Sequence, residues 1–315
     1  MHSFRCRSFI FYISIFILFL PCLASGEGLR PWDLSVRLFS GYDDNVPLDS
    51  KASRFIGDEE SLCFGANLSG AYRIVQTSRW RAGVGASVTQ TLHAESDVED
   101  YDLTTVSPNL FAQYSFMAWG KPATTGLVYT YRNDRLGGDD YEQSHALAWN
   151  IDIQPARAWH TGLYYRLAYE DFDFEGTDPD RTSRDATSHT IGLQATRIFD
   201  RNRRSIMVNY EYGCNDADGD NFEFDSHKIL GRFRTLLVRP FWLVLDAAYT
   251  DQDYTKYTPE PRRTQNNWNY RAMLLVPLNP KLTADFSYSY AKYDGSEAQF
   301  DAERKKVLIG LTYRF

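Results

Sequence analysis

The sequence predicts an all-β fold, namely an antiparallel, up-and-down transmembrane β-barrel of about fourteen strands with short periplasmic turns and longer acidic extracellular loops. Three observations predict this fold class. Apolar and polar residues alternate up to the end of the chain, the first residues have the pattern of an export signal, and the remainder is rich in aromatic residues but poor in cysteine.

The last strand shows the alternation most clearly. One face carries apolar residues, namely Val307, Ile309, Leu311, Tyr313 and Phe315. The other carries Lys306, Gly310, Thr312 and Arg314, with Leu308 as the one apolar exception. Such a strand suits lipid on one side and a wet lumen on the other. The aromatic end resembles the signal that directs Gram-negative barrels to their assembly machinery, which implies that machinery as a partner and Tyr313 and Phe315 as the assembly signal.

Residues 1–26 have the pattern of a secretory signal peptide. Arg5 and Arg7 form the positive start, Phe9–Leu20 the apolar stretch and Ala24–Gly26 a small-residue cleavage site. Residues 27–33 then form a short N-terminal segment, and residues 34–315 are predicted to form a single barrel domain. The chain is therefore expected in the outer membrane of a Gram-negative bacterium, with the signal peptide cleaved.

The composition favours a barrel over a helical membrane protein. Aromatic residues make up 15% of the chain and the mean hydropathy is -0.44, as expected when only every second strand residue meets lipid. Beyond the signal peptide only Cys63 and Cys214 remain. They fall on strands far apart in the predicted order, so we expect two free thiols and no disulfide framework.

The alternation marks each strand in turn. The predicted strands cover Leu34–Tyr42, Leu62–Ile74, Trp80–Leu92, Val106–Phe116, Leu127–Tyr131, Tyr141–Ile153, Trp159–Tyr169, Ile191–Phe199, Ile206–Tyr212, Ile229–Leu237, Phe241–Tyr249, Trp268–Val276, Leu282–Tyr290 and the strand that ends at Phe315. Short turns are predicted at 76–78, 118–122, 155–158, 200–203, 238–240 and 277–281, where Pro, Gly and Asn favour turns. Long loops are predicted at 43–60, 93–103, 133–142, 171–187, 214–226, 251–265 and 293–303.

A Ser-His pair opens three of the strands that follow long loops. The histidines are His145, His189 and His227, and all three fall on the outward face at the extracellular rim. Because they lie on alternate strands, they cannot converge on one metal or substrate. The pattern indicates an interfacial role.

The inward-facing positions are polar and more basic than acidic. The lumen-lining candidates are Arg37, Arg73, Arg81, Arg132, Arg166, Lys228, Arg232, Arg234, Arg271 and Arg314, with Asp152, Glu170, Glu211, Asp246 and Asp285. Seven glycines on the same face leave room, namely Gly65, Gly83, Gly85, Gly126, Gly162, Gly192 and Gly310. A ring of arginines can select anions in a pore. Equally, these arginines can pair with the acids and pack a narrow interior.

Several function classes find no support in the sequence. No serine elbow, metal-spaced histidine cluster or phosphate-binding glycine loop appears, so we expect no enzyme, no catalytic residues, no metal and no cofactor. A net charge of -7 argues against nucleic acid as a partner. The expected surroundings are outer-membrane lipid and lipopolysaccharide.

The sequence also resembles a family of barrels. Gly41-Tyr42-Asp43-Asp44-Asn45-Val46 and the ending Arg304–Phe315 are similar to the barrel domains of surface lipoprotein assembly modifiers and related β-barrel porins. The resemblance implies a membrane barrel over residues 34–315 and passage or display at the cell surface. Lipoprotein-exporting members carry a helical-repeat domain before the barrel, but here only about seven residues separate Glu27, after the predicted cleavage site, from the first strand.

Three functions therefore compete. The first is a pore for small polar solutes with a preference for anions. The second is the barrel component of a surface lipoprotein or polymer export system, which needs a separate periplasmic or lipoprotein partner. The third is a closed structural or adhesive barrel, expected if the inward arginines and acids occlude the bore.

Overall fold

The computed structural model describes residues 30–46, 60–173, 179–258 and 262–315. Within it, Trp32–Phe315 form one compact unit. The predicted signal peptide lies outside the described residues and stays a prediction. The first strand begins at Trp32, two residues before the predicted start.

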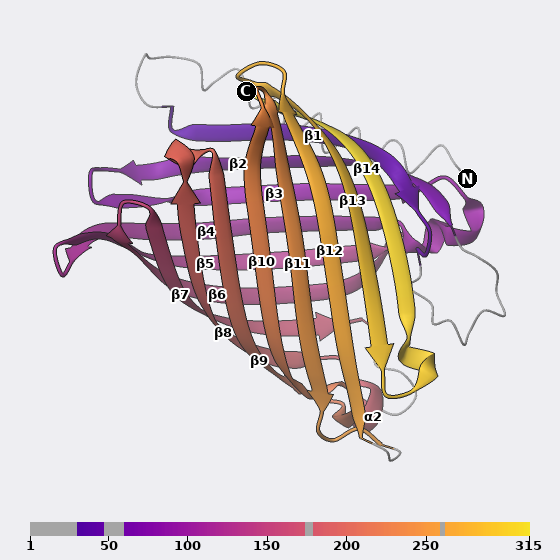
Figure 1. Ribbon diagram of the computed structural model, residues 1–315. Coiled ribbons are helices and arrows are strands. Elements are labelled where there is room, and N and C mark those ends of the chain that lie inside the picture. Colours follow the sequence, from indigo (N-terminus) through magenta and orange to yellow (C-terminus); the bar gives the residue numbers. More distant parts are fainter. Residues whose placement is uncertain (1–29, 47–59, 174–178, 259–261) are drawn as a thin grey trace. The chain divides into compact units, whose positions relative to one another are not determined.

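Fourteen antiparallel strands close into a barrel (Figure 1). The strands are β1 (Trp32–Asp43), β2 (Ser61–Gln76), β3 (Trp80–His93), β4 (Leu103–Ala118), β5 (Lys121–Leu136), β6 (Asp139–Ala156), β7 (Trp159–Phe172), β8 (Ala186–Phe199), β9 (Arg204–Ala217), β10 (Phe224–Val238), β11 (Phe241–Tyr254), β12 (Arg263–Pro277), β13 (Leu282–Gly295) and β14 (Ala302–Arg314). Each strand pairs with its neighbours in the sequence, and β1 pairs with β14 from Ser35↔Arg314 to Asp43↔Lys306. The predicted fold class and strand number are confirmed.

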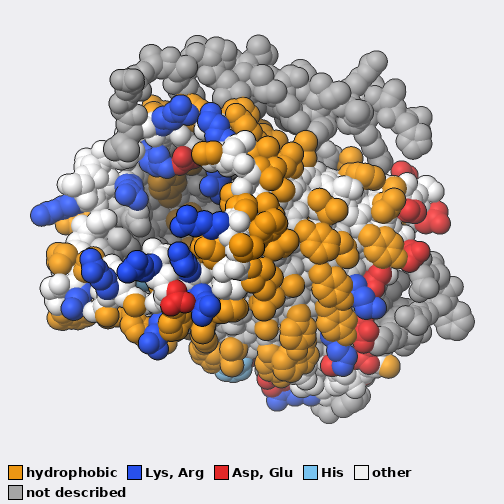
Figure 2. Space-filling model, turned by 45° about the horizontal axis from the view of Figure 1, so that its top comes forward, with side chains coloured by type: hydrophobic (Ala, Val, Ile, Leu, Met, Phe, Trp, Pro, Cys, Tyr) orange, Lys and Arg blue, Asp and Glu red, His pale blue; other side chains and the backbone are white. Residues whose placement is uncertain are grey.

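The two faces of the wall follow the predicted alternation. Outward positions expose large apolar side chains, such as Leu38 on β1 at 58% and Ile309 on β14 at 63%. Figure 2 shows hydrophobic side chains spread over much of the visible outer wall. Because so much exposed apolar surface is unfavourable in water, the pattern is the lipid-facing band of a membrane barrel.

A rim of Tyr–His pairs lies on the outward face. Tyr129 Oη lies 2.7 Å from His145 Nδ1, and the same contact joins Tyr165 to His189 at 2.7 Å. Tyr210 and His227 repeat it at 2.8 Å. Each histidine contacts a tyrosine of the preceding strand, and the three histidines lie on alternate strands without converging, as predicted.

One predicted long loop is wrong. The sequence predicts a loop over residues 133–142, but β5 and β6 continue through them and join at Gly137-Gly138. Both glycines have positive φ, 61° and 104°, which the tight hairpin requires and glycine tolerates without strain. Asp139 and Asp140 thus begin β6, and Arg135 Nε donates to Asp140 Oδ1 at 2.8 Å.

Other extracellular connections are shorter than predicted because their strands extend beyond the apolar band. The predicted loop 214–226 begins as strand up to Ala217 and ends as strand from Phe224. Short helical turns occupy several connections: η3 (Ser96–Tyr101), α2 (Pro179–Thr182), η5 (Asp220–Phe222) and η6 (Ala298–Phe300). The short turns lie at the opposite end, including Trp119-Gly120 between β4 and β5.

Within the described part of the chain, no helix has the length and apolarity to cross a membrane. Cys63 on β2 is fully buried and Cys214 on β9 is partly exposed, and neither forms a disulfide. The predicted free thiols are confirmed.

Candidate functional site

The inner wall of the barrel carries the candidate site. The register places its polar side chains opposite the outward apolar set, so that inward residues of adjacent strands form rows across the wall. Arg232 on β10, Asp246 on β11 and Arg271 on β12 are directly paired in one such row. The site is therefore a surface built from many strands.

Two of the predicted arginines share one carboxylate. Arg232 Nε donates to Asp246 Oδ1 at 2.7 Å, and Arg271 Nε donates to Oδ2 at 2.9 Å. The Asp246 side chain is 9% exposed, whereas the two guanidinium groups are 41% and 43% exposed. Because two cations face one anion, this row keeps one positive charge toward the lumen.

A second pair spans a whole strand. Arg37 on β1 bonds Asp285 on β13, with Nη2 to Oδ2 at 2.7 Å, and the contact passes over Gly310 on the intervening strand β14. Arg37 also lies over the ring of Phe39 at 5.2 Å. This ion pair therefore connects β1 with β13 across β14 on the inner face of the wall.

A third group joins β7, β9 and β10. Tyr164 donates its hydroxyl proton to Glu211 at 2.5 Å, and Asn209 Nδ2 donates to the same carboxylate at 2.7 Å. Lys228 Nζ lies 3.0 Å from Glu211. Tyr164 is not among the predicted lumen residues, although its even number in β7 places it on the inward face with Arg166.

The extracellular end of the inner wall is acidic on one side. Arg132 on β5 donates to Asp134 at 2.9 Å and to Glu142 at 2.8 Å. Glu170 accepts a 3.5 Å hydrogen bond from Ser188. The sequence prediction misses Asp134 and Glu142 because both fall in the predicted loop 133–142. Once this segment is recognised as a hairpin, the alternation along β5 and β6 places both side chains on the inward face.

The remaining predicted residues have mixed surroundings. Arg73 pairs with Asp33, Asp152 accepts from Asn150 Nδ2 at 2.5 Å, and Arg234 stacks over Trp242 at 4.3 Å. Arg81, Arg166 and Arg314 form no ion pair among the described residues. All fifteen predicted side chains thus lie on inward-facing positions, but only some of them meet.

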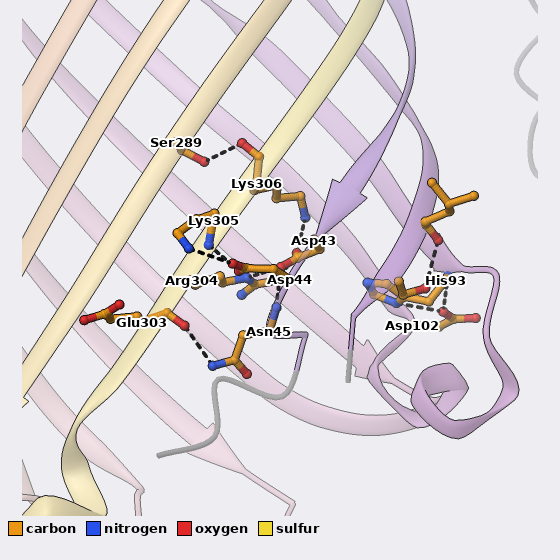
Figure 3. A network of polar contacts seen from close by, with 12 residues as sticks. Asp43, Asp44, Asn45, His93, Asp102, Ser289, Glu303, Arg304, Lys305 and Lys306 are labelled. Carbon is orange, nitrogen blue, oxygen red and sulfur yellow. Dashed lines mark hydrogen bonds and ion pairs between the residues drawn. The ribbon is translucent and has the colours of Figure 1, made fainter. Parts of the chain in front are cut away.

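The sequence prediction misses a charged cluster at the β1–β14 seam. Asp43 on β1 is fully buried (Figure 3). Its carboxylate accepts a hydrogen bond from Arg304 Nε at 2.8 Å and forms an ion pair with Lys306 Nζ at 3.0 Å. Asp43 falls in the predicted loop 43–60. Asp43 continues the alternating inward positions of Arg37 and Gly41, and this alternation could have placed it on the inner wall.

The C-terminal aromatic residues lie on the outer face. The rings of Tyr313 and Phe315 meet edge to face with centroids 5.0 Å apart. The Phe315 N–H donates to the Leu34 carbonyl at 3.1 Å, so the chain end is fixed against β1. Their role as an assembly signal stays a prediction.

The polar contacts run along the wall. In the described ranges, the inner-wall ion pairs join strands that are neighbours or are separated by one strand, as Arg37 and Asp285 are. Figure 2 shows the molecule hollowed at one end, with Lys and Arg side chains gathered around the hollow. Among the described residues, these charged side chains therefore pair along the wall, and none of the ion pairs joins its opposite sides.

The comparison with solved structures supports the barrel fold. The solved structure of Pseudomonas aeruginosa OccK9 (OpdG) matches with a TM-score of 0.51 at 9% identity, covering 90% of this chain and 98% of that chain. Acinetobacter baumannii OccAB1 matches with 0.51 at 11%, covering 93% and 99%. A loop-deleted OmpT, an outer membrane protein of Vibrio cholerae, matches with 0.51 at 9%, covering 90% and 99%.

At these identities the likeness shows a shared barrel fold and no more. No protein-family model matches the sequence, and no curated protein sequence matches it either. None of the three solved structures described above is named as a surface lipoprotein assembly modifier, so the resemblance to that family stays a prediction.

Proposed function

We propose that this protein is an outer-membrane channel for small polar solutes that passes anions more readily than cations. The observation that carries the proposal is the direction of the inner-wall ion pairs, which run along the wall. A closed structural barrel would need charged or bulky side chains to meet across the lumen.

The surplus of cations on the wall supports the anion preference. Arg232 and Arg271 share Asp246, and Arg81 and Arg166 have no carboxylate partner in the described part of the chain. Guanidinium groups that keep free N–H donors toward a wet lumen attract anions and lower the barrier to their passage. No catalytic group is part of the proposal.

The apolar outer band supports a place in the outer membrane. The band surrounds a closed wall, and the barrel has the fold of outer-membrane proteins such as the Vibrio cholerae protein above. Lipid, lipopolysaccharide and the barrel-assembly machinery are the partners that this place implies.

The test is single-channel recording from residues 27–315 refolded in detergent and inserted into planar bilayers. Discrete conductance steps with a reversal potential of anion-selective sign in a salt gradient are expected. A barrel that is folded, as judged by its heat-modifiable migration in gels, but produces no steps would refute the channel. Steps without anion preference would refute only the selectivity.

A further inference from the structure

The seven predicted inward glycines share one structural relationship. Each is the direct cross-strand partner of a larger inward residue. The pairs are Gly65↔Phe39, Gly83↔Phe111, Gly85↔Asn109, Gly126↔Asn150, Gly162↔Asp152, Gly192↔Tyr164 and Gly310↔Asp285. In every pair, atoms of the larger side chain occupy the space that a Cβ of the glycine would need.

Tyr164 and Gly192 show the relationship in full. A Cβ at position 192 would stand 2.2 Å from Tyr164 Cζ, 2.4 Å from its Oη and 2.5 Å from its Cε1. The phenol therefore lies flat over β8, and its hydroxyl reaches Glu211 on β9 at 2.5 Å. The ring can cross an entire strand only because position 192 has no side chain.

Two polar pairs on neighbouring strands repeat the arrangement. A Cβ at Gly162 would stand 2.4 Å from Asp152 Oδ1, and one at Gly126 would stand 2.6 Å from Asn150 Oδ1. Asn150 also donates to Asp152, so both side chains are held against the wall by each other. The space above these glycines is filled by neighbours, which refines the expectation that they simply leave room.

An outward glycine of the same barrel lacks the arrangement. Gly231 on β10 faces the lipid side, and the nearest atom to a Cβ there is the Ala247 carbonyl oxygen at 3.9 Å. A Cβ at position 231 would meet no neighbouring side chain. At six of the seven inward glycines the nearest atom to such a Cβ belongs to the partner side chain, whereas at Gly83 it is the Tyr72 carbonyl oxygen at 2.1 Å. At the outward Gly70 the nearest atom is Leu34 Cδ1 at 3.2 Å, a looser contact than that made by any of the seven.

We infer that these glycines set the width of the bore: each accepts a large neighbouring side chain flat against the wall and so keeps that side chain out of the solute path. The inference rests on the proposed channel function and adds its size-determining residues. Tyr164 is the largest of the side chains held by hydrogen bonds in this way, so Gly192 is the position with the strongest expected effect. A side chain at Gly192 would displace the ring from its place over β8 and turn it toward the lumen.

The test compares four proteins in planar bilayers: wild type, Gly192→Val, Gly231→Val and the double variant Gly192→Val/Tyr164→Ala. Gly192→Val is expected to lower single-channel conductance by about twofold or more, because the displaced phenol narrows the lumen. Gly231→Val is the matched control, a same-sized addition on the lipid side, and should conduct like wild type. The double variant should recover at least wild-type conductance.

The outcomes separate the inference from the channel proposal. If wild type conducts and Gly192→Val conducts equally well, the bore-width inference is overturned and the channel remains. The bore-width inference is also overturned if the double variant keeps the lowered conductance.

If wild type is silent, the channel proposal fails, and the packing is decided by thermal unfolding. Gly192→Val should then lower the melting temperature relative to wild type. In proteins that already carry Tyr164→Ala, adding Gly192→Val should cause no further decrease in melting temperature. Absence of this coupling would overturn the flat packing too. If Gly192→Val does not fold, Gly162→Ala with and without Asp152→Ala repeats the comparison, and equal conductance of wild type and Gly162→Ala would overturn the inference.

Discussion

The buried carboxylate of Asp43 near the end of β1 accepts a hydrogen bond from the Nε of Arg304 on β14 at 2.8 Å (Figure 3). The Asp43 side chain is 0% exposed, and Lys306 also contacts it at 3.0 Å. The first and last strands of the barrel are thus joined by a buried charge cluster at their extracellular ends. Because β1 and β14 come from opposite ends of the chain, this seam closes the barrel.

The seam predicts a specific loss of stability. Arg304→Met removes charge-assisted hydrogen bonds from a buried carboxylate and should lower the free energy of unfolding by about 2 kcal/mol. Urea unfolding in detergent, followed by tryptophan fluorescence, measures the change. Lys305→Met is the matched control because Lys305 is 55% exposed and lies 3.7 Å from Asp44, so it should cost less than about 1 kcal/mol. Equal costs for the two variants would contradict the role of the seam.

The shared carboxylate of Asp246 predicts how selectivity responds to mutation. Arg232→Gln/Arg271→Gln leaves Asp246 as a lone negative charge in its row, so the anion-to-cation permeability ratio should fall. A unit charge at about 4 Å in a water-like medium contributes about 1 kcal/mol, which corresponds to about a fivefold change in the ratio. Asp246→Asn should raise the ratio instead. Reversal potentials in a salt gradient measure both changes.

Arg197 provides the control for selectivity. It lies on the outward series of β8 and packs over the Trp159 ring at 5.3 Å and the Phe199 ring at 4.7 Å. Arg197→Gln removes the same charge from the outer face, so its permeability ratio should equal that of wild type. An equal shift in this variant would show that net charge, and not the inner wall, sets the selectivity.

The strand count and the faces of the wall could be predicted because both depend on local alternation. In a barrel, every second residue meets lipid, so the sequence of one strand is enough to assign its faces. Leu311 and Tyr313 fall on the outward face and Thr312 and Arg314 on the inward face, whichever strands lie beside them. The hairpin at Gly137 was missed because the strand ends extend beyond lipid. There both faces are polar, so the alternation disappears although the ladder of hydrogen bonds continues.

The partners within the site could not be predicted in the same way. Alternation assigns Arg232 and Arg271 to the inner face, but it does not place them beside one aspartate. That meeting depends on the register of β10, β11 and β12, which the lengths of their turns set. The packing of Tyr164 over Gly192 likewise depends on the register between two strands.

Different burial predicts unequal reactivity of the two cysteines. Cys63 is 0% exposed, whereas Cys214 near the extracellular end of β9 is partly exposed. In the folded mature protein, a maleimide should modify Cys214 at least about tenfold faster than Cys63, since Cys63 reacts only when the wall opens. Cys214→Ser isolates the slow thiol, and urea should release it. Rapid modification of Cys63 in the folded barrel would contradict its burial in the wall.

Glu95 in the connection between β3 and β4 predicts a pH-dependent tether. It accepts hydrogen bonds from the Ser61 hydroxyl and, at 3.1 Å, from the Leu62 N–H. The Ser61 hydrogen bond is the largest cause that lowers the pKa of Glu95 below its ordinary value of 4.5.

Because the pKa of Glu95 is lower in the folded than in the unfolded state, the tether contributes stability above pH 4.5. This contribution is lost as the pH falls through the lowered value. Hydrogen-exchange protection of the Leu62 amide, corrected for intrinsic rates, should therefore be constant above pH 4.5 and fall as the pH is lowered further. Glu95→Gln keeps an acceptor that does not titrate, so its protection should be independent of pH over this range. A pH-dependent loss that persists in Glu95→Gln would assign the effect to another group.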